Sequence, residues 1–251
     1  NNWYMVLADA DAHLASKKWK NAPNGHSVGI DILQEKDRKA LIQKADLVIS
    51  MLPAFLHFEV AKDCLSLGKA LFTASYVDES MRSISQEIKQ QGLLFLCEMG
   101  LDPGIDHMSA MELIDRIKSK NGQITGFKSH CGGLIAPESD TNPWHYKISW
   151  NPRNIILAGK AGAVYLENGL EKHVPYPSIF ENCAEISVPN WGQLSYYPNR
   201  DSLSYIKTYQ LEGVQNFIRT TLRHPSFSKG WNAIVQMGLT NEEEFEKPMN
   251  T

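Results

Sequence analysis

Apolar positions follow two alternating patterns along the first hundred residues. Short continuous apolar runs, typical of buried strands, are separated by segments in which apolar residues recur every three or four positions, as on one face of a helix. The predicted strands are residues 3–8, 27–32, 47–52, 70–77 and 93–97, and the predicted helices are residues 10–19, 35–44, 56–67 and the segment between Asp78 and Gly92. Strands that alternate with helices at this spacing predict βαβ units and a parallel sheet.

The run at 93–97 leads into a turn and then a further helix, because apolar residues recur three apart after the turn. Asp102 followed by Pro103 fits a helix N-cap and first helical residue, since proline has no N–H to leave unpaired. However, a turn that also carries Asp106 and His107 at the carboxyl end of a strand is where an open α/β sheet places its ligand crevice. Both interpretations remain open from the sequence.

The βα pattern stops in the second half of the chain. We expect a strand at 123–131, further strand at 186–197 that is broken by Pro189, a hairpin of 163–166 with 170–174 around the Glu167-Asn168-Gly169 turn, and helices at 213–222 and 231–237. This mixture predicts a separate α+β domain. The expected organisation is an α/β chain with a Rossmann-like, dinucleotide-binding domain at residues 1–102 and an α+β substrate-binding domain at residues 103–251.

Composition and charge narrow the class of protein. Lys+Arg 25 against Asp+Glu 28 gives a net charge of -3, which does not favour nucleic acid or an anionic membrane as a partner. The four cysteines lie far apart without a C-x-x-C pair, which favours reduced thiols and no zinc or other metal site. No apolar window approaches a membrane span and no signal-peptide pattern opens the chain. We therefore expect a cytoplasmic protein with a small-molecule substrate, and a homodimer is compatible with the sequence.

The first predicted strand ends at Asp9. A dinucleotide fold places an acid there to hydrogen-bond the adenosine ribose, and an anion would repel a 2′-phosphate, so NAD is expected in preference to NADP. The alternative is that Asp9 or Asp11 caps the helix that follows.

The glycine turn that should cradle the pyrophosphate is not found. A G-x-G-x-x-G motif is expected about 20 residues before the ribose-binding acid, whereas only eight residues precede Asp9 in this sequence. We therefore expect the first strand and its glycine turn to be missing from the sequence given. The chain as given should bind a dinucleotide poorly.

Two loop-like segments of the second half each contain an arginine, Arg153 and Arg200. The planar guanidinium suits a carboxylate ligand, because two parallel hydrogen bonds fix its orientation. The alternatives are a surface ion pair, such as Arg200 with Asp201, or a solvated side chain. His57 and His130 lie beside apolar residues, where a histidine is more often structural than a base.

Several longer motifs resemble one family over the chain from Trp3 to Leu239. They are MLPAFLH (51–57), ASYV (74–77), EMGLDPGIDHM (98–108), HCGGLIAPESDTNPWHYKISWNPRN (130–154), PNRDS (198–202) and TLRHPSF (221–227). These motifs resemble the saccharopine dehydrogenase family, in its glutamate-forming branch. The resemblance implies a Rossmann domain with an inserted substrate domain, and a chain that stops before the segments that complete that domain.

The resemblance also implies a reaction and a site. The reaction is the oxidation of saccharopine by a nicotinamide cofactor to glutamate and 2-aminoadipate 6-semialdehyde. The implied substrate contacts, with two neighbouring candidates included, are Ser75, Asp102, Asp106, Cys131, Trp150, Arg153, Arg200 and Thr221. The implied cofactor contacts are Asp9, Pro53, Ser75 and Tyr76. The first candidate for the general base is Asp102 or an ordered water, and the second is His107.

Two other functions remain open. A carboxynorspermidine-type dehydrogenase also reduces an imine between an amine and an aldehyde, although the CGGLIAPESDTNP and NPR motifs weigh against it. A non-catalytic module that keeps the substrate domain without the cofactor turn is the alternative from a different class.

Overall fold

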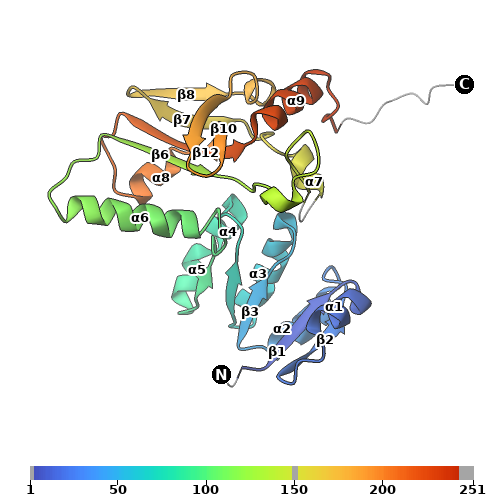
Figure 1. The fold of residues 1–251 in the computed structure, drawn as a ribbon. Coiled ribbons are helices and arrows are strands. Elements are labelled where there is room, and N and C mark those ends of the chain that lie inside the picture. The colour runs from blue at the N-terminus through green and yellow to red at the C-terminus, as the bar shows by residue number, and fades with distance from the viewer. Residues whose placement is uncertain (1–2, 149–151, 243–251) are drawn as a thin grey trace, which may run out of the picture. The chain divides into compact units, whose positions relative to one another are not determined.

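The computed structural model describes residues 3–148 and 152–242. The chain divides into two compact units, Asn1–His107 and Met108–Thr251, and each is described by itself (Figure 1). Within the described ranges, no helix has the length and apolar character that crossing a membrane requires. The domain boundary expected near Asp102 stays a prediction.

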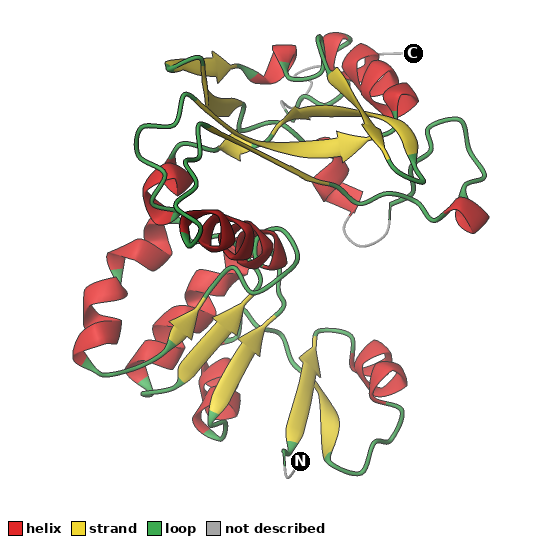
Figure 2. Cartoon of the chain, turned by 60° about the vertical axis from the view of Figure 1, so that its left-hand side comes forward, coloured by secondary structure: helices red, strands yellow, loops and turns green. Residues whose placement is uncertain are grey.

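The strands of the first unit form two parallel sheets. They are β1 (Met5–Asp9), β2 (Gly25–Gly29), β3 (Leu47–Ser50), β4 (Ala70–Thr73) and β5 (Phe95–Leu96). β1 pairs with β2, and β3, β4 and β5 lie side by side in that order (Figure 2). The predicted α/β class with a parallel sheet is confirmed. The expectation of a further strand before the first residue stays a prediction.

Helices connect these strands. They are α1 (Ala12–Trp19), α2 (Glu35–Gln43), α3 (His57–Ser66) after the short 3-10 turn η1 (Ala54–Leu56), α4 (Glu79–Ser83) and α5 (Ser85–Gln90). Asp78 caps α4 as expected, because its carboxylate accepts a hydrogen bond from Met81 N. The single helix expected up to Gly92 is wrong in one respect, since it breaks at Ile84 into α4 and α5. Apolar residues of α3 and β4 form the buried core of this unit.

Helix α6 (Ile105–Lys118) starts at the end of the first unit. The interpretation of Asp102 and Pro103 as its N-cap and first residue is therefore wrong. A tight turn precedes the helix instead, because Gly100 N donates to Pro103 O and Ile105 N donates to Gly100 O, both at 2.9 Å. Asp102 lies within this turn, where its side chain is available to the site.

The second unit contains one mixed sheet. Its strands are β6 (Gly126–Cys131), β7 (Ala163–Glu167), β8 (Leu170–Val174), β9 (Ala184–Val188), β10 (Gly192–Pro198), β11 (Arg200–Asp201) and β12 (Asn216–Arg223). The order is β11-β7-β12-β10-β9, with β6 beside β12 and β8 beside β7. The remaining elements are α7 (Pro152–Ile156), α8 (Ser204–Thr208), α9 (Pro225–Gln236) and the 3-10 turns η2 (Pro137–Ser139) and η3 (Tyr176–Ser178). The α+β class expected for this half is confirmed.

One predicted element of this unit is wrong. Residues 213–222 were expected to be helical, but most of them form strand β12, which pairs with β6, β7 and β10. Its β-branched residues suit a strand that is buried by partners distant in sequence. The break expected at Pro189 is confirmed, because strand β9 ends at Val188 and β10 begins at Gly192. The two strands form a hairpin that turns at Asn190, where φ is +67°. The hairpin of β7 and β8 is confirmed.

Candidate active site

The first group of candidate residues lies at the carboxyl ends of β4 and β5. Tyr76 Oη donates a 2.8 Å hydrogen bond to Asp102 Oδ1. The backbone ties the same two segments together, because Glu98 N donates to Ser75 O at 3.0 Å. The resemblance implied that Tyr76 contacts the cofactor. In the structure, its hydroxyl is hydrogen-bonded to Asp102.

Asp106 and His107 follow in the same turn and in the first residues of α6. Asp106 Oδ1 accepts a 2.8 Å hydrogen bond from Gly104 N, so this carboxylate stabilises the turn. His107 Nε2 lies 3.1 Å from Glu98 Oε2 and 3.8 Å from Asp106 Oδ1. The imidazole is thus oriented by two carboxylates, and its side chain is 16% exposed.

Ser75 belongs to a cluster of hydroxyl groups around His57. Its Oγ lies 2.7 Å from His57 Nε2, and Ser50 Oγ lies 2.8 Å from His57 Nδ1. Thr73 Oγ1 also approaches His57 Nε2, at 3.2 Å. Burial lowers the pKa of His57 below the usual histidine value. From the sequence, His57 was interpreted as a structural residue. The feature that could have indicated this cluster is that both β3 and β4 end in a hydroxyl residue.

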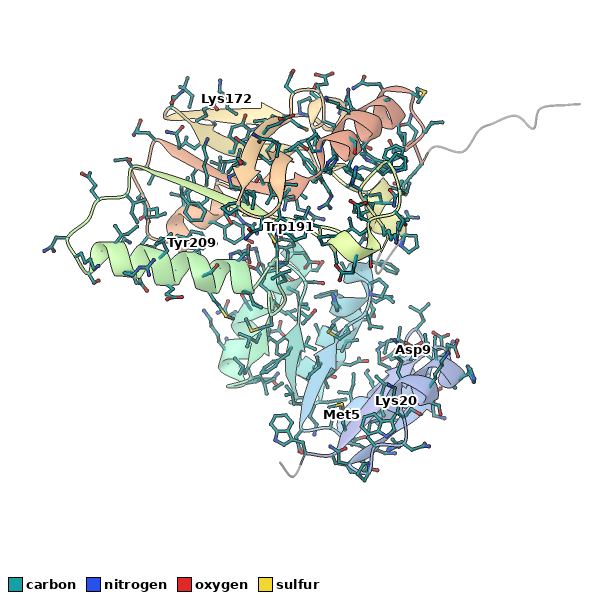
Figure 3. The ribbon with its side chains drawn as sticks, in the orientation of Figure 1. Met5, Asp9, Lys20, Lys172, Trp191 and Tyr209 are labelled. Atoms are coloured by element: carbon teal, nitrogen blue, oxygen red, sulfur yellow. The ribbon has the colours of Figure 1, made fainter. Side chains whose placement is uncertain are left out.

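The remaining cofactor candidates of this unit lie at other strand ends. Pro53 is exposed and precedes the 3-10 turn η1 after β3. Asp9 is exposed at the end of β1 opposite Met5 (Figure 3), and its Oδ1 accepts from Asp11 N at 2.9 Å. Asp11 in turn caps α1 through Leu14 N, so the capping interpretation is confirmed for Asp11.

These strand ends fit a dinucleotide only in part. The carboxyl ends of parallel strands are where such folds bind nucleotides. Asp9 carries a negative charge, but it is exposed and accepts a hydrogen bond from the backbone of its own turn, so water screens its charge from a 2′-phosphate.

The second unit brings another group of candidates onto neighbouring strands. Cys131 and Thr221 are direct register partners in the parallel pair of β6 and β12. Arg200, in β11, directly follows Asn199, whose N–H donates to Arg219 O of β12 at 2.9 Å. Side chains of register partners lie on the same face of a sheet, so Cys131 and Thr221 share a face. Arg200 is exposed in β11, which pairs with β7.

Arg153 has a partner at the surface of the second unit. Its Nη2 lies 2.5 Å from Glu242 Oε1, and Lys160 Nζ lies 2.9 Å from Glu242 Oε2. This is the surface ion pair that the sequence left open as the alternative to a ligand contact. Trp150, the remaining candidate, lies outside the described residues.

His130 is a structural residue in its surroundings. Its Nδ1 lies 2.6 Å from the hydroxyl of Thr220, and its ring packs edge-on against Tyr196. Burial is the largest influence on its pKa and lowers it. These contacts agree with the structural interpretation of His130.

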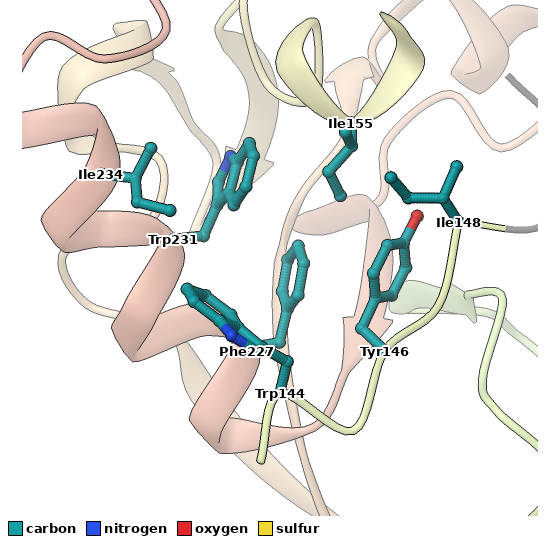
Figure 4. Close-up of a pocket in the computed structure, with 7 residues that line it drawn as sticks. All are labelled: Trp144, Tyr146, Ile148, Ile155, Phe227, Trp231 and Ile234. Atoms are coloured by element: carbon teal, nitrogen blue, oxygen red, sulfur yellow. The ribbon is translucent and has the colours of Figure 1, made fainter. Parts of the chain in front are cut away.

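An apolar pocket of about 230 Å³ lies elsewhere in the second unit (Figure 4). The residues that line it are Trp144, Tyr146, Ile148, Ile155, Phe227, Trp231 and Ile234. Because this lining offers no cation, the pocket does not suit a substrate with several carboxylates. Among the residues with described positions, no group of three His, Cys, Asp or Glu side chains is placed to bind a metal ion.

Parallel strands with polar side chains at their carboxyl ends, followed by a domain with a mixed sheet, define the class of dinucleotide-binding α/β proteins. Residues 1–96 match the family model described as saccharopine dehydrogenase NADP binding domain, and residues 100–251 match saccharopine dehydrogenase C-terminal domain. The chain belongs to the saccharopine dehydrogenase family.

Named relatives and a solved structure agree with this assignment. The chain is 40% identical to alpha-aminoadipic semialdehyde synthase of Arabidopsis thaliana, over 96% of this chain and 24% of that protein. It is 35% identical to saccharopine dehydrogenase [NADP(+), L-glutamate-forming] of Pyricularia oryzae, over 92% of this chain and 52% of that one. The apo histidine-tagged saccharopine dehydrogenase (L-Glu forming) of Saccharomyces cerevisiae has a TM-score of 0.85 at 30% identity, covering 97% of this chain and 54% of that one. The chain thus spans a quarter to about half of these proteins.

The expectation of NAD as the preferred cofactor is wrong. The family model that matches residues 1–96 is an NADP binding domain, and the relatives of Pyricularia oryzae and Saccharomyces cerevisiae are named as NADP(+) enzymes. The expectation rested on the charge of Asp9 alone. That carboxylate is exposed and hydrogen-bonded within its own turn, where water weakens its repulsion of a phosphate.

Proposed function

We propose that the protein oxidises saccharopine to L-glutamate and 2-aminoadipate 6-semialdehyde, with NADP⁺ as the electron acceptor. Membership of the family and the names of the relatives support this proposal. The structural observation that carries it is the 2.8 Å hydrogen bond from Tyr76 to Asp102, because it orients a carboxylate at the carboxyl ends of β4 and β5.

The reaction needs few groups from the protein. The carbon next to the secondary amine loses a hydride and the nitrogen loses a proton, which leaves an imine. Water then adds to the imine carbon and the C–N bond breaks, giving the amine of glutamate and the aldehyde. The chemistry that a bound NADP⁺ supplies is acceptance of the hydride; the protein has to orient the substrate and move the protons.

Asp102 is the residue we assign to the reacting nitrogen. Its carboxylate opposes the positive charge that develops on the nitrogen as the imine forms. It also accepts the amine proton before water attacks. Tyr76 donates to one carboxylate oxygen and thereby fixes the direction of the other.

His107 is the weaker candidate for the base. Its Nε2 already lies within 3.1 Å of Glu98 Oε2, which favours a role in orienting the turn. Asp102 is therefore preferred.

Each unit, taken by itself, offers donors for a carboxylate. Saccharopine carries three carboxylates, so it needs cationic and neutral donors. Arg200 supplies a guanidinium, and Thr221 and Ser75 supply hydroxyl groups. Cys131, the register partner of Thr221, lies beside that hydroxyl on the same face of the sheet.

The test is steady-state kinetics of the full-length protein, following NADPH formation from saccharopine. Asp102→Asn should lower kcat/KM about 10²–10⁴-fold, the usual contribution of a positioned acid or base. Tyr76→Phe should lower it about 10-fold, because it removes one hydrogen bond to a charged group.

The matched control is Tyr4→Phe, which removes an exposed phenol that contacts His26 at 3.1 Å in the same unit. It should leave kcat/KM unchanged. Full activity in Asp102→Asn, or no NADPH from saccharopine with the unmodified protein, would overturn the proposal.

We also propose a cytoplasmic, homodimeric protein. Cys64, Cys97 and Cys183 form no disulfide, as is usual for a protein in a reducing compartment. Cell fractionation and light scattering of the full-length protein test the two statements separately.

A further inference from the structure

We propose that His57 is a positioning residue that presents the hydroxyl of Ser75 as a hydrogen-bond donor to a substrate carboxylate. The proposal rests on the proposed function for the identity of the substrate, and on the geometry around His57 for everything else. His57 is the first residue of α3, and it lies between the ends of β3 and β4.

The imidazole is enclosed by hydroxyl groups. His57, Ser50 and Thr73 are 5%, 4% and 2% exposed, whereas Ser75 is only partly buried. Hydrogen bonds link Ser50 Oγ to Nδ1 at 2.8 Å and Ser75 Oγ to Nε2 at 2.7 Å. A series of hydrogen bonds therefore leads from the buried Ser50, through the imidazole of His57, to Ser75, which a ligand can reach.

A neutral imidazole has one N–H donor and one bare nitrogen that accepts. His57 is in this neutral form because its desolvation outweighs the attraction of Asp78, the charged group that raises its pKa. Which group donates in each of these hydrogen bonds then depends on which ring nitrogen carries the proton.

Ser50 decides the direction. Among the described residues, the imidazole is the side-chain hydrogen-bond partner of Ser50 Oγ. If Nδ1 were the donor, the hydroxyl hydrogen of Ser50 would be buried without an acceptor, which costs more than an unused lone pair. Thr73 Oγ1 is the competing group, because it lies 3.2 Å from Nε2 and 3.5 Å from Nδ1. Its contacts are longer than the 2.8 Å contact of Ser50, and its oxygen already accepts from Ser75 N. We therefore assign Ser50 as the donor to Nδ1, and Nε2–H as the donor to Ser75 Oγ.

The consequence falls on Ser75. Because its oxygen accepts from His57, its own hydrogen points away from the imidazole. A hydroxyl whose oxygen already accepts a hydrogen bond is a stronger donor, since successive bonds polarise one another. Ser75 directly precedes Tyr76, which reaches Asp102, and its carbonyl accepts from Glu98 N. The donor thus belongs to the same strand-end segment as Tyr76, whose hydroxyl contacts the carboxylate assigned to the reacting nitrogen.

The first test measures the tautomer and does not depend on activity. In the full-length protein labelled with ¹⁵N-histidine, two-bond ¹⁵N–¹H spectra distinguish the two neutral forms, and His57→Gln identifies the signal by its loss. The expected result is a neutral ring with the proton on Nε2. A proton on Nδ1, or a charged ring at neutral pH, would overturn the proposal even if the enzyme oxidises saccharopine.

The second test is kinetic. It compares Gln and Asn at position 57, because their side-chain amides extend to different distances from the backbone. The Gln nitrogen takes the place of Nε2 and the Asn nitrogen that of Nδ1, so His57→Gln keeps the donor to Ser75 and His57→Asn loses it. His57→Asn and Ser75→Ala should each raise the KM for saccharopine about 10-fold, the worth of one hydrogen bond to a charged group. His57→Gln should stay within about 3-fold, and the KM for NADP⁺ should change in none of them.

A double-mutant cycle of Ser75→Ala and His57→Asn completes the test. In a Ser75→Ala background, His57→Asn should add no further loss, because the two changes remove one interaction. Three outcomes would show a merely structural role. They are equal rises of the KM for saccharopine in His57→Gln and His57→Asn, additive rises in the double variant, and a matching rise in the KM for NADP⁺. If the unmodified enzyme does not turn over saccharopine, the proposed function fails and the tautomer alone decides the orientation of His57.

Discussion

Gly104 determines the shape of the turn that contains Asp102. Its φ is +150°, and a Cβ built there would lie 2.1 Å from Gly100 O. The obstacle is backbone, which cannot rotate away as the end of a side chain can. The turn, and with it the position of Asp102, therefore depends on the absence of a side chain at residue 104.

Gly104→Ala should accordingly destabilise the protein by about 1–3 kcal/mol, the usual cost of overpacking, and lower kcat/KM with it. Urea unfolding and steady-state kinetics measure the two effects. Gly133→Ala is the control, because a Cβ at Gly133 meets nothing within 4 Å. The same effect in both variants would show that the turn tolerates a side chain.

His57 also makes stability depend on pH. Its pKa in the folded protein is lowered by burial, with Asp78 acting weakly in the opposite sense. The unfolded chain, in which the histidine pKa is about 6.5, therefore binds the proton more readily than the folded protein does. The contribution of His57 is complete above that pH and is lost as the pH falls below it.

We thus expect the urea concentration at the midpoint of unfolding to decrease when the pH is lowered from 7.5 to 5.5. The decrease should be smaller in His57→Gln. His130 and His224 also have lowered pKa values and account for part of the remaining dependence. An identical pH dependence in the variant and the unmodified protein would contradict this prediction.

At the scale of elements, one buried ion pair joins α2 to α3. Arg38 Nε lies 2.6 Å from Asp63 Oδ2, with both side chains about 5% exposed, and Arg38 also donates to Ile32 O at 2.6 Å. Removing Asp63 leaves the buried guanidinium of Arg38 with only the more distant carboxylate of Glu59, at 3.8 Å. Such changes cost about 3–5 kcal/mol.

Asp63→Asn should therefore lower the free energy of unfolding by an amount in that range, measured by urea unfolding at neutral pH. Glu35→Gln is the control, because it breaks only an exposed pair with Lys39, and exposed pairs contribute little to stability. Comparable losses in the two variants would argue against a special role of the buried pair.

The elements that the sequence predicted correctly are those determined by local pattern. Parallel strands buried on both faces are continuous apolar runs, and the helices between them have one apolar face, so the first unit was predicted almost element by element. Strand β12 was mistaken for a helix because its character depends on β6, β7 and β10, whose residues lie far away in the chain. The turn at Asp102 was mistaken for a helix cap because its geometry depends on Gly100 and Gly104 together.

At the scale of the whole molecule, the candidate site draws on segments distant in sequence. The spacing of strands indicated that Ser75 and Asp102 lie at strand ends, and the motifs indicated Cys131, Arg200 and Thr221. The sequence could not show which side chains meet. The bond from Tyr76 to Asp102 and the hydroxyl groups around His57 depend on the pairing of β3, β4 and β5, which apolar periodicity does not specify.

Arg200→Met should raise the KM for saccharopine at least about 10-fold while leaving the KM for NADP⁺ unchanged, because it removes a charged donor to a carboxylate. Steady-state kinetics of the full-length protein measure both constants. Arg116→Met, at an exposed position on α6, is the control in the same unit. An unchanged KM in Arg200→Met would remove this arginine from the site.

The two separate parallel sheets of the first unit have a practical consequence. Among the strands in the described residues, β1 pairs only with β2, and β3 pairs only with β4. Met5, Val6 and Ile49 on these strands are 51%, 38% and 59% exposed. Unsatisfied strand edges with apolar side chains recruit other chains. Recombinant preparations limited to residues 1–251 should accordingly be handled as prone to precipitation, with low protein concentrations and solubility-enhancing fusions.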